Sequence, residues 1–150
     1  MNPNGFLLLN LALAFYNVGT IWAHEVDIFR SWRFVGAAEF HQLQQVHWRK
    51  LPYWIFIPVG LSLLGSIVLI WYHPAGSSTL VIWSALACQL ASHALTAVLW
   101  GPWQARLSQD PLGPRSRFLD KILSTHWIRT ALINAYGFIL LGWSIRTATC

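Results

Sequence analysis

One long stretch of this chain carries no charge: from Leu51 to Ala105 there is no Asp, Glu, Lys or Arg. A soluble domain needs roughly 25% charged residues to cover its surface. The whole chain has only 10% charged residues and 55% hydrophobic residues. Lipid is the solvent in which such a stretch is ordinary. The sequence therefore predicts an all-α polytopic protein of the cell inner membrane, with its 150 residues in one domain.

Four apolar segments are long enough to cross a bilayer, because about 20 helical residues span the hydrocarbon core. They are residues 5–23, 51–72, 78–100 and 127–145. The pair Gly101-Pro102 is expected to end the third segment. The backbone must be helical at that depth, where no water is available to it. A short turn joins segments two and three, so we expect an antiparallel four-helix transmembrane bundle.

The basic residues orient this bundle. Only Arg146 belongs to the side that carries the termini, and the other basic residues belong to the loops after segments one and three. These are Arg30, Arg33, Arg49, Lys50, Arg106, Arg115, Arg117, Lys121 and Arg129. By the positive-inside rule those loops face the cytoplasm and both termini face the outer, periplasmic side. The basic residues form no patch with interleaved aromatics, so the expected partner is the lipid bilayer and not nucleic acid.

The two long loops have different compositions. Residues 34–50 lack Pro and predict an interfacial helix between the first and second segments, which enters the second across Leu51-Pro52. Residues 108–114 contain two prolines and a glycine, and predict an irregular connection. Residues 115–125 are expected to start a helix that runs into the last segment.

Polar side chains are costly in lipid, and here they follow helical stripes on three of the four segments. The stripes consist of Asn10, Asn17 and His24 at intervals of seven, Gln89 and His93 four apart, and His126, Thr130 and Asn134 at intervals of four. A four-helix bundle can turn all three stripes inward. The sequence therefore predicts a polar interior.

Depth divides these polar residues into two layers in the cytoplasmic half. Asn17, His93 and Asn134 lie about 7–10 Å inside the nearest interfacial tryptophan at 1.5 Å per residue, and we expect them to meet in one buried layer. Gln89 is one turn deeper. A shallow layer at the interface contains His24, Glu25, His126 and Arg129, with His41 or His47 from the loop helix placed to cap it.

Two kinds of chemistry fit this arrangement. His24 and His126 have matching depths and suit a bis-histidine haem, whereas His93 is too deep to share a metal with them. In the cofactor-free alternative, a buried histidine acts as general acid or base while an arginine holds a phenolate, enolate or carboxylate. The catalytic residues would be His93, Arg129 and His126. The binding residues would be His24, Glu25, His41, Asn17, Gln89 and Asn134.

Several motifs carry a resemblance to known proteins. The segments Trp100-Gly101-Pro102-Trp103-Gln104-Ala105-Arg106-Leu107 and His126-Trp127-Ile128-Arg129-Thr130, with Ser31-Trp32-Arg33 and His41, resemble small four-helix bacterial integral membrane proteins of unknown function. That group is similar to the anthrone-oxygenase-like membrane proteins, whose last span also opens with an Arg-Thr pair. The resemblance implies a four-helix bundle that oxidises an apolar, aromatic polyketide-like molecule without a metal.

A non-catalytic role is the alternative. A small tryptophan-rich bundle can brace a larger membrane complex, assemble as a homo-oligomer, or hold a pigment, haem, quinone or lipid. The two hypotheses differ in the polar layer: an enzyme needs a cavity there, whereas a brace fills the space with side chains. The chain has no HExxH motif, glycine-rich phosphate loop or paired carboxylates, so hydrolase and nucleotide chemistry are not expected.

Overall fold

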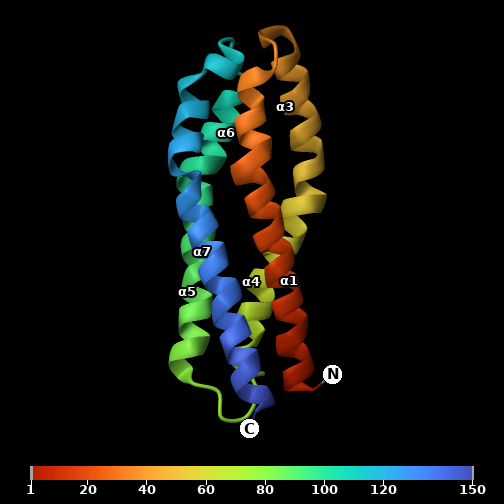
Figure 1. Ribbon diagram of the computed structural model, residues 1–150, viewed down its shortest axis with the longest axis vertical. Coiled ribbons are helices and arrows are strands. Elements are labelled where there is room, and N and C mark those ends of the chain that lie inside the picture. The colour runs from red at the N-terminus through yellow and green to blue at the C-terminus, as the bar shows by residue number, and fades with distance from the viewer. Residues whose placement is uncertain (1, 150) are drawn as a thin grey trace.

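The computed structural model describes residues 2–149, which form four long apolar helices joined by short connections (Figure 1). Each helix is long and apolar enough to cross a membrane: Pro3–Phe34, Ala37–Val68, Thr79–Leu107 and Arg117–Ala148. They run alternately up and down, and both ends of the chain lie at the same end of the bundle. The predicted all-α four-helix membrane bundle is confirmed.

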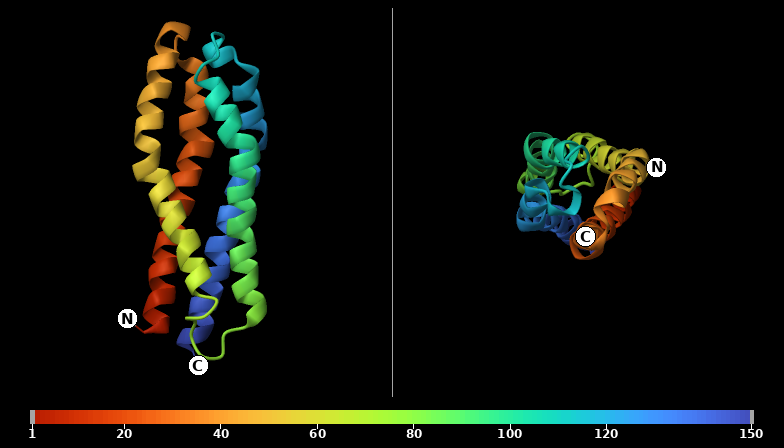
Figure 2. Two further views of the ribbon diagram at one scale, coloured as in Figure 1. Left: turned by 180° about the vertical axis from the view of Figure 1, so that it is seen from behind. Right: turned by 90° about the horizontal axis from the view of Figure 1, so that it is seen from above.

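The long helices are assembled from shorter elements. The first contains α1 (Pro3–Ala23) and α2 (Phe29–Ser31), and the second contains α3 (Ala37–Leu51) and α4 (Ile57–Val68). The third contains α5 (Thr79–Leu95) and α6 (Gly101–Leu107), and the fourth is α7 (Arg117–Ala148). Seen from above, the helices occupy the corners of a square in chain order (Figure 2), so α7 is a neighbour of both the first helix and the third.

Two expected boundaries differ from the structure. Residues 37–51 form no separate interfacial helix but continue directly into the second span, and the third helix continues past Gly101-Pro102 to Leu107. Both differences have the same cause: a π turn beside Pro52 and another beside Pro102 let the helix continue through the proline. A helix of 32 residues is about 48 Å long at 1.5 Å per residue, longer than the roughly 30 Å of a hydrocarbon core. We call the end with the connections 35–36 and 108–116 the basic end, and the opposite end the terminal end.

The interior contains two separate apolar clusters. At the terminal end the cluster includes Leu7, Leu69, Ile82, Tyr136 and Leu140, all buried. At the basic end a second cluster contains Phe29, Trp32, Phe40, Leu107, Leu119 and Ile122. Along each helix, a zone separates the residues of one cluster from those of the other. Most of the inward-facing polar residues lie in this zone.

Candidate functional site: a cavity bordered by three π turns

Three of the long helices are interrupted by one π turn each, at His24–Ile28, Pro52–Phe56 and Thr96–Trp100. Each turn is closed by a hydrogen bond to the carbonyl five residues back. The backbone N–H of Phe29 bonds to His24, that of Ile57 to Pro52 and that of Gly101 to Thr96. Single π turns within α-helices are rare and occur frequently at functional sites.

The local sequence explains two of these turns. Proline lacks an N–H and its ring clashes with the carbonyl four residues back, so a regular α-helix cannot accept it unchanged. Pro52 begins the second π turn, and Pro102 follows directly after the third. Gly101 closes the third turn, and a Cβ there would lie 2.9 Å from the carbonyl oxygen of Thr96. These two turns therefore lie where proline interrupts an apolar helix, whereas the first turn contains neither proline nor glycine.

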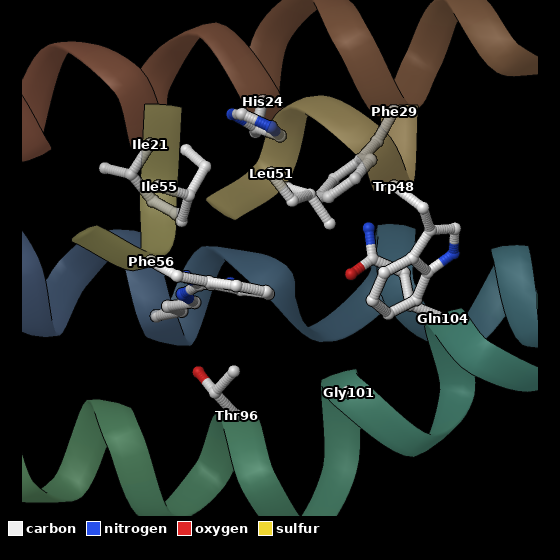
Figure 3. Close-up of a pocket in the computed structure, with 11 residues that line it drawn as sticks. Ile21, His24, Phe29, Trp48, Leu51, Ile55, Phe56, Thr96, Gly101 and Gln104 are labelled. Carbon is white, nitrogen blue, oxygen red and sulfur yellow. The ribbon is translucent and has the colours of Figure 1, made fainter. Parts of the chain in front are cut away.

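All three π turns border one small cavity of about 40 Å³ in the zone between the apolar clusters. Figure 3 shows His24 from the first helix, Trp48 and Phe56 from the second, and Thr96 and Gln104 from the third around this common space. The remaining lining residues are Ile21, Phe29, Leu51, Ile55, Gly101 and Arg129. A water molecule needs about 10–15 Å³ measured in this way, so the space suits a few waters or the polar end of a ligand.

Arg129 is the only cation among the residues that line this cavity. Its Nε is buried without a hydrogen-bond partner, and the structure pairs it with no carboxylate among residues 2–149. The indole Nε1 of Trp48 is likewise buried and unpartnered. Both groups are obligate donors. Arg129, with a buried N–H that has no partner, thus lies on the wall of a mainly apolar cavity, an arrangement that an acceptor oxygen would complete.

His24 adds a nitrogen of defined tautomer to this cavity. Its Nδ1 lies 2.7 Å from the carbonyl oxygen of Thr20 and must donate, because a carbonyl can only accept. Its Nε2 is therefore the basic nitrogen. The His47 ring packs 5.7 Å from the His24 ring, centroid to centroid. His47 Nε2 lies 3.4 Å from the amide nitrogen of Gln104, which links the second helix to the third beside the cavity.

Next to the cavity, a buried carboxylate joins the first and last helices. Glu25 Oε2 accepts a hydrogen bond of 2.8 Å from His126 Nδ1, and Glu25 Oε1 lies 3.2 Å from Arg30 Nη2. The His126 side chain is only 1% exposed, and its Nε2 has no partner. Glu25 and Arg30 are five residues apart and meet because the π turn brings such positions onto one face.

The packing of Phe29 does not suit a haem between His24 and His126. The Phe29 ring contacts both imidazoles, with centroid distances of 5.3 Å to His24 and 4.7 Å to His126. The adjoining cavity is far smaller than the roughly 300 Å³ or more of typical cofactor pockets. Within residues 2–149, no group of three His, Cys, Asp or Glu is placed to hold a metal ion.

His93 and Gln89 lie away from the cavity lining. The Nδ1 of His93 donates to the Gln89 carbonyl oxygen at 2.7 Å, and the Gln89 amide donates to Ser62 Oγ at 3.0 Å. Ser62 and Ser66 both hydrogen-bond to the Tyr136 hydroxyl, at 3.3 and 2.9 Å. Gln89 is therefore part of a buried network that holds α4, α5 and α7 together.

The expected layer of Asn17, His93 and Asn134 does not form. In the described residues no hydrogen bond joins any two of them, because His93 bonds within its own helix and Asn134 bonds to Trp22 and within its own helix. Asn134 accepts from Trp22 Nε1 at 3.2 Å and donates to the Thr130 carbonyl at 2.7 Å. Both amide atoms of Asn17 are buried without a partner.

His41 is exposed at the basic end, where it does not reach the cavity lining. Its Nδ1 donates to the Ser108 carbonyl at 3.0 Å, and its Nε2 accepts from Gln45 at 2.9 Å. Both ring nitrogens are thus engaged, and the Nδ1 bond ties α3 to the connection after α6. This places His41 in a structural contact outside the shallow layer.

Three lining residues with polar side chains were not among the candidates from the sequence: Trp48, Thr96 and Gln104. Trp48 looked like one more interfacial tryptophan, and Gln104 lay beyond the expected end of the third span. The prolines at positions 52 and 102 were the available signal, since a proline inside a long apolar helix points to a local defect. If each proline is taken as an interruption of its helix and not as the end of the helix, its neighbours in the chain become candidate site residues.

Comparisons with known proteins add no relative: no protein-family model, no curated protein and no solved structure matches this chain. The functional argument therefore rests on the residues and their geometry.

Proposed function

We propose that this protein binds an apolar molecule carrying an acidic oxygen, and that Arg129 holds this oxygen inside the membrane domain. The single observation behind the proposal is the buried Arg129 Nε without a partner, on the wall of a cavity. Leaving a buried donor unsatisfied costs about 1–3 kcal/mol, and more for a charged group. A ligand that supplies an acceptor removes this cost, so the site favours a carboxylate, phenolate or enolate.

The cavity walls indicate where the rest of the ligand lies. Phe29, Ile55 and Phe56 make the surroundings of Arg129 apolar and aromatic. Phe56 lines the cavity and is also 49% exposed, so it reaches from the cavity to the outside of the bundle. We place the oxygen of the ligand at Arg129 and its apolar body along Phe56, with access from the lipid.

His24 gives the same site an acid–base group. When the ligand is a phenol or an enol, its hydroxyl proton passes to His24 Nε2 and the electron pair stays on the ligand oxygen. The resulting oxyanion then faces the Arg129 guanidinium. This step supports an enzymatic role on an aromatic substrate, because the ionised form of such a molecule is its electron-rich form. Arg129 and His24 would be the two catalytic residues.

The basic end belongs on the cytoplasmic side in this proposal, since nine of the ten basic residues lie toward it. A reporter enzyme active only outside the cytoplasm, fused after Thr149, should then be active. The same reporter inserted in the 108–116 connection should be inactive. The opposite pattern would reverse the orientation.

Binding is tested with a matched pair of probes, 2-naphthoate and its neutral isostere 2-naphthamide, titrated calorimetrically into the detergent-solubilised protein. We expect the wild type to prefer 2-naphthoate. Arg129→Gln should weaken 2-naphthoate binding roughly 10-fold or more, the effect of about 1.5–3 kcal/mol for a charged hydrogen bond, and leave 2-naphthamide unchanged. The control is Arg146→Gln, at the far end of the same helix. Equal affinity for both probes in the wild type would refute the proposal.

Thermal unfolding separates this function from a bracing role. An unpaired buried charge destabilises the protein that carries it, so a functional Arg129 predicts that Arg129→Gln unfolds at a higher temperature than the wild type. A bracing subunit predicts the reverse, because its polar residues exist to hold helices together. A lower unfolding temperature for Arg129→Gln, with 2-naphthoate binding unchanged, would favour the brace.

A further inference from the structure

A second hollow, of about 430 Å³, lies on the outside of the bundle between the first helix and α7. Its walls include Trp22, Glu25, Val26, Arg30, Trp127 and Asn134. It is separate from the Arg129 cavity, since the two share no lining residue. We call it the α1–α7 groove.

The hydrogen bonds already made in this groove engage its carboxylate and amide oxygens, and they leave some of its N–H donors free. Both carboxylate oxygens of Glu25 are engaged, one by His126 and one by Arg30. The Asn134 amide oxygen accepts from Trp22, and its nitrogen donates to a backbone carbonyl. Each carboxylate and amide oxygen of these two side chains thus already accepts a hydrogen bond from within the protein.

Two donors of the groove stay available. Arg30 spends its Nε and one Nη2 proton on Glu25, which leaves the rest of its guanidinium free, and its side chain is 59% exposed. The indole N–H of Trp127 has no hydrogen-bond partner within residues 2–149, and Trp127 is 58% exposed. A guanidinium fork and an N–H group without competing acceptors select an anion with several oxygens, such as phosphate.

The surroundings of these donors match the boundary between lipid headgroups and acyl chains. Trp22 and Trp127 flank the groove, and exposed tryptophans on a membrane helix lie at that level. Val26 is 58% exposed on the groove wall and offers an apolar surface beside the charged pair. A ligand here meets cationic and apolar surface together.

We infer that the α1–α7 groove binds one phospholipid, with its phosphate held by Arg30 and the Trp127 indole N–H and an acyl chain against Val26. The charge of the free donors argues for phosphate, and the lipid-facing position between two tryptophans argues for a membrane lipid as its source. Glu25 keeps Arg30 in place through two contacts, one to its carboxylate and one to its backbone carbonyl, so the donor fork is fixed before the lipid arrives.

Native mass spectrometry of the full chain with added lipids tests this site. The probes are dioleoylphosphatidylglycerol, which has a phosphodiester, and dioleoylglycerol, which has the same chains without it. We expect the first to be retained and the second to be lost. Arg30→Gln should reduce retention of the phospholipid roughly 10-fold, and Trp127→Phe, which removes only the N–H donor among polar groups, roughly 3-fold.

The matched control is Arg33→Gln, which removes a nearby arginine that pairs with Asp120 and does not line the groove. Circular dichroism checks that each variant stays helical, and Trp127→Phe keeps the Glu25–Arg30 ion pair intact. Equal retention of the two lipids, or equal retention by wild type and both groove variants, would overturn the inference. Full displacement of the lipid by glycerol 3-phosphate would assign the groove to a soluble anion and would overturn it as well.

Discussion

His126 donates a hydrogen bond from Nδ1 to Glu25 Oε2 at 2.8 Å, which joins α7 to the π turn of the first helix across 101 residues of chain. The His126 ring also packs at right angles against Phe29, with 4.7 Å between centroids. Since the other oxygen of Glu25 contacts Arg30, this carboxylate connects the buried centre of the bundle to its surface. The cavity and the α1–α7 groove lie on either side of this link.

The first prediction concerns that link. Glu25→Gln keeps the shape of the side chain but removes its charge, so the bonds to His126 and Arg30 both weaken. We expect the free energy of unfolding to fall by about 1–3 kcal/mol, seen as a lower midpoint in denaturant or on heating in detergent. Glu39→Gln is the control, because Glu39 is exposed and its side chain makes no hydrogen bond or ion pair within the described chain. Equal destabilisation by both variants would show that the link contributes nothing specific.

A second prediction concerns the polar network of the terminal half. The Tyr136 hydroxyl is the shared partner of Ser62 and Ser66, and Tyr136 is 1% exposed. Tyr136→Phe should destabilise the protein by about 0.6–1.7 kcal/mol, the range of interhelical hydrogen bonds in membranes. Tyr53→Phe, at a tyrosine that is 72% exposed, should change nothing measurable. If Tyr136→Phe leaves the free energy of unfolding unchanged, Ser62 and Ser66 find other hydrogen-bond partners.

The third prediction is a pH dependence of the connection between α6 and α7. Asp110 accepts hydrogen bonds from Ser116 Oγ at 2.6 Å and from the Leu112 backbone N–H at 3.0 Å. These two bonds hold the pKa of the Asp110 carboxyl below its ordinary value of 3.8. A lowered folded-state pKa stabilises the connection above the ordinary value, and this stabilisation disappears as the pH falls through the lowered pKa.

The chemical shift of the Leu112 amide reports that transition. Its midpoint on acid titration should lie below the ordinary pKa of aspartate, and Asp110→Asn should abolish it. A midpoint at or above that value would contradict the hydrogen bonds assigned to the carboxylate. Because Asp110 is half-exposed and lies in a connection, we expect the effect to stay local and the midpoint of global unfolding to change little.

Much of the fold follows from hydropathy alone. Four spans, a tight hairpin between the second and third, and a last helix that begins before its span are all present in the structure. The continuity of the third helix through Pro102 was not predicted, because the usual rule for proline in a helix is a break or a kink. A π turn is another way in which a helix accommodates a proline. It depends on how the neighbouring helices pack, and a single sequence does not reveal this packing.

The same π turns explain why the site was only partly predictable. Depth along the helices predicts one region that contains His24, Glu25, His126 and Arg129. A helical stripe, however, assumes a rotation of about 100° per residue. Each π turn inserts one residue, which rotates the faces of the helix beyond the turn. Glu25 and Arg30, five apart and in contact, show the shift directly. Gln104, beyond the π turn of the third helix, reaches the cavity for the same reason.

The last prediction concerns the closest approach of α1 and α4. A Cβ on Gly65 would lie 1.7 Å from Asn10 Oδ1, well inside contact distance. Asn10 is 3% exposed and its Nδ2 donates to the Phe6 carbonyl at 2.8 Å, so its amide cannot move aside without losing that bond. Gly65→Ala should therefore destabilise the bundle by about 1–3 kcal/mol, the usual cost of overpacking.

Gly60 on the same helix supplies the control, because a Cβ there meets nothing within 4 Å. Gly60→Ala should be neutral or stabilising by up to about 1 kcal/mol, the difference in helix propensity. The double variant Asn10→Ala with Gly65→Ala should recover part of the loss, since the smaller side chain vacates the space that the new methyl group needs. Thermal unfolding of the four proteins in one detergent measures this, and a Gly65→Ala protein as stable as the Gly60→Ala protein would show that the two helices are further apart than described.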